Sequence, residues 1–164
     1  SDLSCKLIRG NVDTRIKKLN EGLYDAIILS YAGIRSLMLE NEVTEIFSTK
    51  ELIPSAGQGI ISLQCRQIDS EIFSILEKIN HKETYHRAHA ERNTLKILEG
   101  DCETAVGVHS IIDGDMITLE AELFSLDGSQ RFYEKNSSKV ENSKELGRKL
   151  GQILKKKSNN SYKK

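Results

Sequence analysis

The sequence predicts an α/β partial lobe, followed by a small α+β domain with a three-stranded antiparallel sheet and helices on one face. Two observations support this prediction. The continuous apolar run Ala26–Leu29 is bounded by polar residues and lies between two helical patterns, as a buried parallel strand does. Later in the chain, the pairs Asp113-Gly114 and Asp127-Gly128 separate three strand-like segments, and Asp-Gly is a strong signal for a hairpin turn.

The α/β part is predicted over 1–53, because strand-like and helix-like segments alternate there. Asn11 or Asp13 can cap the first helix, and Gly22 can end it. The expected elements are a short strand over 5–9, a helix over 14–20, a strand over 25–30 and a helix over 31–37.

The segment 54–59 contains the only proline of the chain and two glycines. It separates two different patterns, so we expect a linker, a hinge or a ligand loop. A strand is expected over 60–65. Apolar residues then recur at helical spacing and predict a helix over 69–78.

The pattern of helix-like and strand-like segments over 82–157 predicts an α-β-β-β-α unit. This unit carries its own core and should fold independently. The chain after it is rich in lysine, serine and asparagine, so we expect 158–164 to be a disordered tail. The elements expected within the unit are a helix over 83–98, strands over 105–112, 116–124 and 130–135, and a helix over 143–154.

The composition argues against several classes of protein. The 24 Lys and Arg residues balance 24 Asp and Glu residues, whereas a general nucleic-acid binder normally carries a basic excess. No apolar run approaches the roughly 18 residues of a membrane span. Cys5, Cys65 and Cys102 lie far apart without a CxxC pair, which argues against a disulfide framework or a zinc ribbon. Because the first residues also lack a signal-peptide pattern, we expect a cytoplasmic protein.

Arg9 and Arg15 place a guanidinium on each side of an expected helix start. Unpaired N–H groups and the helix macrodipole favour an anion at such a place. The alternative is that both arginines are solvated or pair with local acids. The stretch Gly57-Gln58-Gly59 could let the backbone approach an anion, but it matches no known phosphate-binding fingerprint.

Cys102 follows a helix and lies in a loop with acidic neighbours. A loop thiol can be a nucleophile or a covalent attachment point, but spacing alone favours an ordinary half-buried cysteine. His86 and His89, with Glu83 one turn earlier, could hold zinc on one helix face. A solvated helix face is the favoured alternative, and we predict no metal.

Several further segments carry a family pattern. They are Arg9-Gly10-Asn11-Val12-Asp13-Thr14-Arg15, Tyr24-Asp25-Ala26-Ile27-Ile28-Leu29, Ala32-Gly33, Pro54-Ser55-Ala56-Gly57-Gln58-Gly59, Gln64-Cys65-Arg66, Ile79-Asn80-His81, Ala90-Glu91-Arg92 and Leu98-Glu99-Gly100-Asp101-Cys102. In this order, over residues 6–154, they resemble the porphobilinogen deaminases, also called hydroxymethylbilane synthases.

The resemblance implies an enzyme of haem and tetrapyrrole biosynthesis. The family joins four porphobilinogen units head to tail, releases ammonia each time and frees hydroxymethylbilane. It does so on a dipyrromethane cofactor held through a thioether to one cysteine, and the matching position here is Cys102. Arg9 and Arg15 match positions that pair with the carboxylates of porphobilinogen and its oligopyrroles.

The family has three domains, of which the first two are α/β lobes that resemble periplasmic binding proteins. On this map, Gly57, Gln58 and Gly59 belong to a hinge and offer backbone N–H groups to the cofactor. The implied boundaries are 1–53 for the C-terminal half of domain 2, 54–59 for the hinge, 60–78 for a segment returning to domain 1, 82–157 for domain 3 with the cofactor cysteine, and 158–164 for the tail.

This sequence also departs from the family pattern. The family's catalytic aspartate lies outside it, so we expect a C-terminal portion that is inactive alone. Ser36 stands where the family usually has an arginine, and Asp101 and Ala105 replace a glycine and a proline near the cysteine. The full-length family enzyme is expected to be a monomer without nucleic-acid or membrane partners, whereas residues 1–78 should aggregate or self-associate for lack of partner strands. The alternative function is that of a non-catalytic anion-binding module or a structural remnant.

Overall fold

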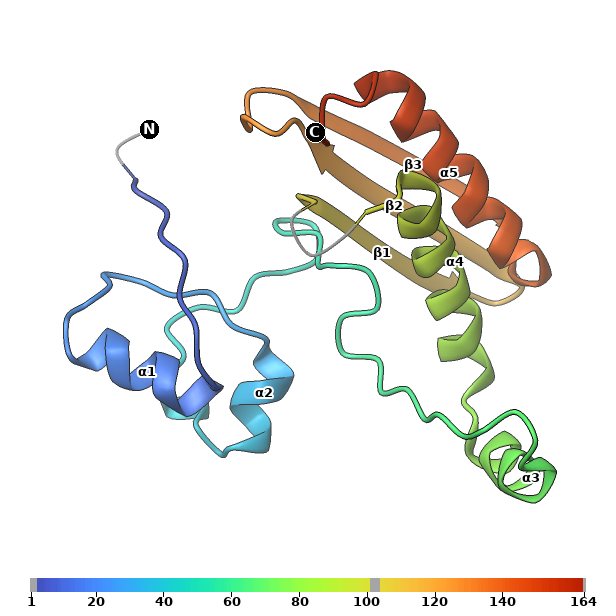
Figure 1. Cartoon of the computed structure of the whole chain (residues 1–164), viewed down its shortest axis with the longest axis horizontal. Helices are drawn as coiled ribbons and strands as arrows, with labels where there is room; N and C mark the ends of the chain where they lie inside the picture. Colours follow the sequence, from blue (N-terminus) through green and yellow to red (C-terminus); the bar gives the residue numbers. More distant parts are fainter. Residues whose placement is uncertain (1–2, 101–103, 164) are drawn as a thin grey trace. The chain divides into compact units, whose positions relative to one another are not determined.

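The computed structural model describes residues 3–100 and 104–163 (Figure 1). The chain forms two compact units, Ser1–Phe47 and Ser48–Lys164. The main cluster of buried apolar side chains lies within the second unit.

The first unit contains two short α-helices and a 3-10 turn. They are α1 (Val12–Asn20), α2 (Tyr31–Ser36) and η1 (Glu40–Glu42). Ile16 of α1 and Ile34 of α2 are buried. A Cβ on Gly33 would lie 3.2 Å from Val12 Cγ2, so the two helices approach each other at this glycine.

The prediction of strands over 5–9 and 25–30 is wrong, because the described residues of the first unit include no β-strand. Ile28 remains 68% exposed. A buried parallel strand needs neighbouring strands for its N–H and C=O groups, and the described residues supply none. The strand expected over 60–65 is likewise irregular. The structure therefore does not show a periplasmic-binding-protein-like lobe.

The second unit confirms the expected three-stranded antiparallel sheet. Its order is β1-β2-β3, with β1 (Val106–Asp113), β2 (Met116–Phe124) and β3 (Arg131–Lys139). Both expected Asp-Gly turns connect neighbouring strands. Gly114 and Gly128 adopt φ +58 and φ +70, which favour glycine.

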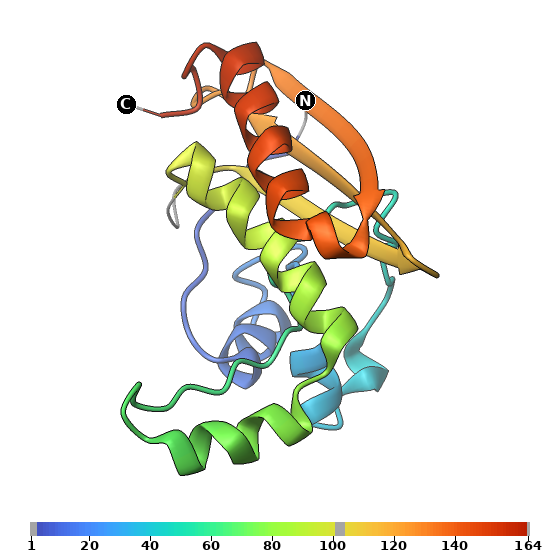
Figure 2. The same ribbon diagram turned by 90° about the vertical axis from the view of Figure 1, so that its right-hand side faces the viewer.

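Helices α4 and α5 cover one face of this sheet (Figure 2). Their bounds are α4 (Lys82–Leu98) and α5 (Ser143–Ser158), with the short turn η2 (Val140–Asn142) before α5. The fully buried side chains between the layers include Val108, Ile117, Leu119, Leu150 and Leu154. The helices approach closely because α5 carries glycines where a Cβ would meet α4: at Gly147 it would meet the Ala90 carbonyl, and at Gly151 it would lie 2.8 Å from Ile97 Cβ.

The described end of the chain, 158–163, differs from the disordered tail expected over 158–164. Tyr162 is 2% exposed, and its hydroxyl donates to the Leu98 carbonyl at 2.8 Å. Leu126 N–H donates to the Ser161 carbonyl at 2.9 Å. A single aromatic residue among lysines and asparagines gives little sequence signal, yet burying its ring between α4 and the sheet outweighs the polar composition.

Helix α3 (Ser70–Ile79) confirms the helix expected near 69–78. None of its residues is buried. Ile72, Phe73, Ile75 and Ile79 are 46%, 55%, 51% and 64% exposed, so its apolar face lies open. Within the described ranges, no helix combines the length and the apolar character needed to cross a bilayer.

Candidate functional site

The chain after Ile53 lies along the outer side of β1. Val108 N–H donates to the Pro54 carbonyl at 2.7 Å, as a strand donates to its neighbour. A Cβ on Gly107 would lie only 2.5 Å from the Ile53 carbonyl oxygen, so this approach requires glycine. Ile53 itself is buried. The start of the expected hinge is therefore fixed to the sheet.

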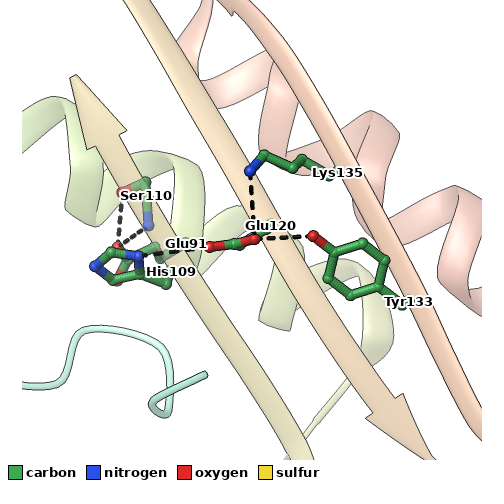
Figure 3. A network of polar contacts seen from close by, with 6 residues as sticks. All are labelled: Glu91, His109, Ser110, Glu120, Tyr133 and Lys135. Carbon is green, nitrogen blue, oxygen red and sulfur yellow. Dashed lines mark hydrogen bonds and ion pairs between the residues drawn. The ribbon is translucent and has the colours of Figure 1, made fainter. Parts of the chain in front are cut away.

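A buried acid on α4 holds the next part of this loop, and Figure 3 shows this acid, Glu91, beside Ser110 of β1. Glu91 is 3% exposed, and its Oε2 accepts a hydrogen bond from Gly57 N–H at 2.8 Å. Its Oε1 accepts from the N–H and the hydroxyl of Ser110, at 3.0 and 2.7 Å. These three donors offset the cost of burying a carboxylate.

Sequence reasoning gave Glu91 no role of its own. The signal that could have found it is its place on α4: Glu91 lies among Ala90, Thr94 and Leu98, which are all buried. An acidic residue on the buried face of a helix requires donors from elsewhere in the fold.

The loop conformation limits which backbone groups can bind a ligand. Gly57 and Gly59 have φ +77 and φ +79, which favour glycine. Gly57 N–H is used by Glu91, and Gln58 N–H donates to the Ser55 carbonyl at 3.0 Å. Of Gly57, Gln58 and Gly59, only Gly59 has an N–H without an acceptor among the described residues, so it is the one of the three that is free to bind an anion in this conformation.

The arginines Arg9 and Arg15 flank the start of α1 in the first unit. Arg15 Nε donates to the Gly10 carbonyl at 2.7 Å, and Lys18 Nζ donates to the Arg9 carbonyl at 2.8 Å. The N-cap residue Asn11 makes no side-chain hydrogen bond to the helix. Uncapped N–H groups, two guanidiniums and an ammonium give this turn the chemistry of a carboxylate site.

Cys102 lies outside the described residues. The segment before it is described: α4 ends at Leu98, and Glu99 has a left-handed φ of 54. Of the other two cysteines, Cys5 is exposed and Cys65 is half-buried, and both are free thiols.

The histidines considered as metal ligands have other contacts. His86 Nδ1 lies 3.2 Å from Ser143 Oγ, and His89 packs edge-on against the Tyr85 ring, with centroids 4.2 Å apart. In the part of the chain that the structure describes, no three His, Cys, Asp or Glu side chains are grouped to hold a metal ion.

The sheet face opposite the helices carries a polar network (Figure 3). Glu120 Oε2 accepts from the Tyr133 hydroxyl at 2.8 Å and lies 3.6 Å from Lys135 Nζ. His109 Nδ1 is 4.0 Å from Glu120 Oε1, which is too long for a hydrogen bond. Burial, and then the charge of Arg87, lower the pKa of His109 against the opposing effect of nearby carboxylates. These effects favour the neutral form of His109.

The first unit thus offers an uncapped helix start between two arginines, and the second offers a glycine loop held by a buried acid in a small α+β domain. Comparison with known families shows which class of protein combines these parts. The family model described as "Porphobilinogen deaminase, dipyromethane cofactor binding domain" matches residues 1–74. The model described as "Porphobilinogen deaminase, C-terminal domain" matches residues 85–156. The chain belongs to the porphobilinogen deaminase family.

Curated relatives agree with these matches. The chain is 39% identical to a porphobilinogen deaminase of Trichlorobacter lovleyi over 153 residues, which are 93% of this chain and 49% of the relative. It is 37% identical to a porphobilinogen deaminase of Prochlorococcus marinus over 153 residues, which are 93% of this chain and 48% of the relative. The chain thus spans about half the length of these relatives.

Proposed function

We propose that this chain is the C-terminal portion of an enzyme that joins four porphobilinogen units, releasing ammonia each time, into hydroxymethylbilane. The observation that carries the proposal is the uncapped turn between Arg9 and Arg15 at the start of α1, within a segment that matches the family's cofactor-binding model. Porphobilinogen carries acetate and propionate groups, which guanidinium donors suit. The free thiols Cys5 and Cys65 support a reducing compartment, so we place the reaction in the cytoplasm.

The same residues fit the family's cofactor. Dipyrromethane, when bound, would supply the primer on which the pyrrole chain grows. We infer that Cys102 holds it through a thioether and that Arg9 and Arg15 bind its carboxylates. The free N–H of Gly59 is a further donor for an anion.

We also propose that turnover needs the N-terminal half that the relatives have beyond this chain. Two features support this. Segments 5–9 and 25–30 have main-chain polar groups without strand partners, and α3 has an exposed apolar face. Both are typical of a surface that packs against another part of a protein. In the proposed map, 1–53 completes a second α/β domain, 54–59 is a hinge, 60–78 packs on a first domain, and the unit from 82 is the third.

The intact mass of the chain tests the function directly. The chain is incubated with porphobilinogen, alone and with the N-terminal half of a relative, beside the variants Cys102→Ser and Cys65→Ser. We expect an added mass of two pyrrole units in the presence of the N-terminal half, kept in Cys65→Ser and lost in Cys102→Ser. An adduct that persists in Cys102→Ser, or no adduct under either condition, would refute the proposal.

The alternative is a non-catalytic anion-binding module, which the irregular backbone of 5–9 and 25–30 favours, because it leaves the α/β part incomplete. It predicts reversible carboxylate binding that is weakened by salt and by Arg15→Ala, with Cys102 remaining a free thiol. The mass measurement separates the two functions.

A further inference from the structure

The last described residues of the chain contact the end of α4, and both segments belong to the second unit. After α5, Asn159 and Asn160 adopt left-handed φ values of 46 and 59, which asparagine tolerates better than most residues. The chain turns at these two residues. Tyr162 and Lys163 thereby reach the residues with which α4 ends.

Three side chains from this part of the chain hold the end of α4. The Tyr162 hydroxyl donates to the Leu98 carbonyl at 2.8 Å, which satisfies one of the carbonyls that a helix end leaves without a partner. Glu99 Oε2 lies 3.2 Å from Lys155 Nζ and 2.5 Å from Lys163 Nζ. The ammonium groups, that of Lys163 before that of Lys155, lower the pKa of the Glu99 carboxyl. We refer to Lys155, Tyr162 and Lys163 as the tail clamp.

The residue that the tail clamp holds has an unusual backbone conformation. Glu99 has a left-handed φ of 54, at a helix end where glycine is the usual residue. Its N–H donates to the Lys96 carbonyl at 3.2 Å, and the Gly100 N–H donates to the Leu95 carbonyl at 3.1 Å. A side chain other than hydrogen keeps such a conformation only where its surroundings hold it. The two lysines on the Glu99 carboxylate supply part of that restraint.

The proposed attachment point follows directly in the sequence. Cys102 is three positions beyond Glu99 and lies outside the described residues, but three residues of chain span at most about 11 Å. On the other side of Cys102, the Ala105 carbonyl accepts a hydrogen bond from the Phe124 N–H at 3.0 Å, which joins the chain to the end of β2. The segment that carries the thiol therefore leaves from one restrained residue and returns to another.

We propose that the tail clamp positions the segment that carries Cys102, so that its three side chains are positioning residues for growth of the pyrrole chain. This inference rests on the proposed function. The clamp acts through Leu98 and Glu99 and not through contact with a substrate. The Glu99 side chain is 62% exposed, and ion pairs of such exposure add little to stability. Their loss should therefore change the rate of the reaction more than the free energy of unfolding.

The test is the rate of pyrrole addition to the full chain, followed by intact mass in the presence of porphobilinogen and the N-terminal half of a relative. Glu99→Gln and Lys163→Gln should each lower kcat about tenfold, because a displacement of about 1 Å can cost a reaction about 100-fold. KM and the urea midpoint should stay unchanged. Lys163→Arg keeps the charge and should retain most of the rate.

The two variants also separate positioning from charge. Glu99→Gln removes a negative charge and Lys163→Gln removes a positive one, so an effect of charge on the Cys102 thiol would have opposite signs in them. Loss of the clamp lowers kcat in both. The matched control is Lys156→Gln, at an exposed position of α5 that forms no ion pair in the part of the chain that is described. Effects of opposite sign, an equal effect of the control, or an unchanged kcat would overturn the proposal.

The two proposals fail separately. An adduct that forms at the same rate in all variants would leave the transferase function standing and remove the clamp. If no adduct forms at all, the proposed function fails, and alkylation of Cys102 by iodoacetamide still tests the clamp. Glu99→Gln and Lys163→Gln should then both raise the alkylation rate of Cys102 about two- to fivefold relative to Cys65, because a released segment opens more often. Unchanged or opposite rates would overturn the clamp.

Discussion

Glu91 on α4 accepts a hydrogen bond from the main-chain N–H of Gly57, 34 positions earlier, at 2.8 Å. The bond joins the proposed hinge to the C-terminal α+β domain. It also fixes a loop whose glycines could otherwise sample many conformations. Because this loop is fixed to the α+β domain, motion at the proposed hinge must come from residues outside the fixed loop.

Replacing Glu91 with Gln should loosen this loop. An amide NH2 cannot accept a hydrogen bond, so either Gly57 or Ser110 would lose its acceptor. We expect a loss of about 1–3 kcal/mol in the free energy of unfolding, measured by urea denaturation. Amide exchange should accelerate at Gly57 or Ser110. Glu83→Gln, on the exposed part of the same helix, is the matched control and should change little.

Replacing Gly107 with Ala should displace the chain at Ile53. The added Cβ would lie 2.5 Å from the Ile53 carbonyl oxygen, and backbone must move to relieve this contact. We expect a cost of about 1–3 kcal/mol and faster amide exchange at Val108, whose N–H is bonded to Pro54. Unchanged exchange at Val108 would contradict the close approach.

The C-terminal tyrosine should contribute measurably to stability. Tyr162→Phe removes the hydrogen bond to the Leu98 carbonyl and should cost about 0.5–1.5 kcal/mol. Tyr162→Ala also removes the buried ring and should cost about 3–5 kcal/mol. Thermal denaturation measures both. Tyr85, which is 45% exposed, provides the control Tyr85→Phe. If Tyr162→Ala matched that control, the tail would not be packed.

The stability of the second unit should fall as the pH drops below about 6.5, the unfolded pKa of histidine. The pKa of His109 is lowered by burial and by Arg87, so the unfolded state binds more protons than the folded state in this window. His89 acts with the same sign. The difference between the urea midpoints at pH 7.5 and pH 5 should shrink in His109→Gln, where only the contribution of His89 is left. An unchanged difference would show that His109 does not cause it.

The sequence predicted the α+β domain well because its signals are local. Asp113-Gly114 and Asp127-Gly128 mark turns in which the glycine adopts a positive φ. Between these turns, buried residues alternate with less buried ones along most of β2. The parallel strand around Ile28 was not found, because such a strand depends on neighbours that the described residues do not contain.

The parts that sequence reasoning missed depend on tertiary contacts. Tyr162 is one aromatic residue in a polar segment, and only the end of α4 makes it part of the core. Glu91 was given no role of its own because its donors, Gly57 and Ser110, come from elsewhere in the fold. The anion-binding interpretation of Arg9 and Arg15 remains a prediction, to which the structure adds an uncapped helix start.

The attachment of Pro54 to β1 bears on how this domain can be excised. The helix at 82 looks like the natural place to begin an isolated domain, but the second compact unit begins at Ser48. A piece starting at 82 would leave the Val108 N–H open to solvent, on an edge strand that can then template pairing with another molecule. A piece starting at Ser48 would keep that edge blocked and stay monomeric at concentrations where the shorter one assembles.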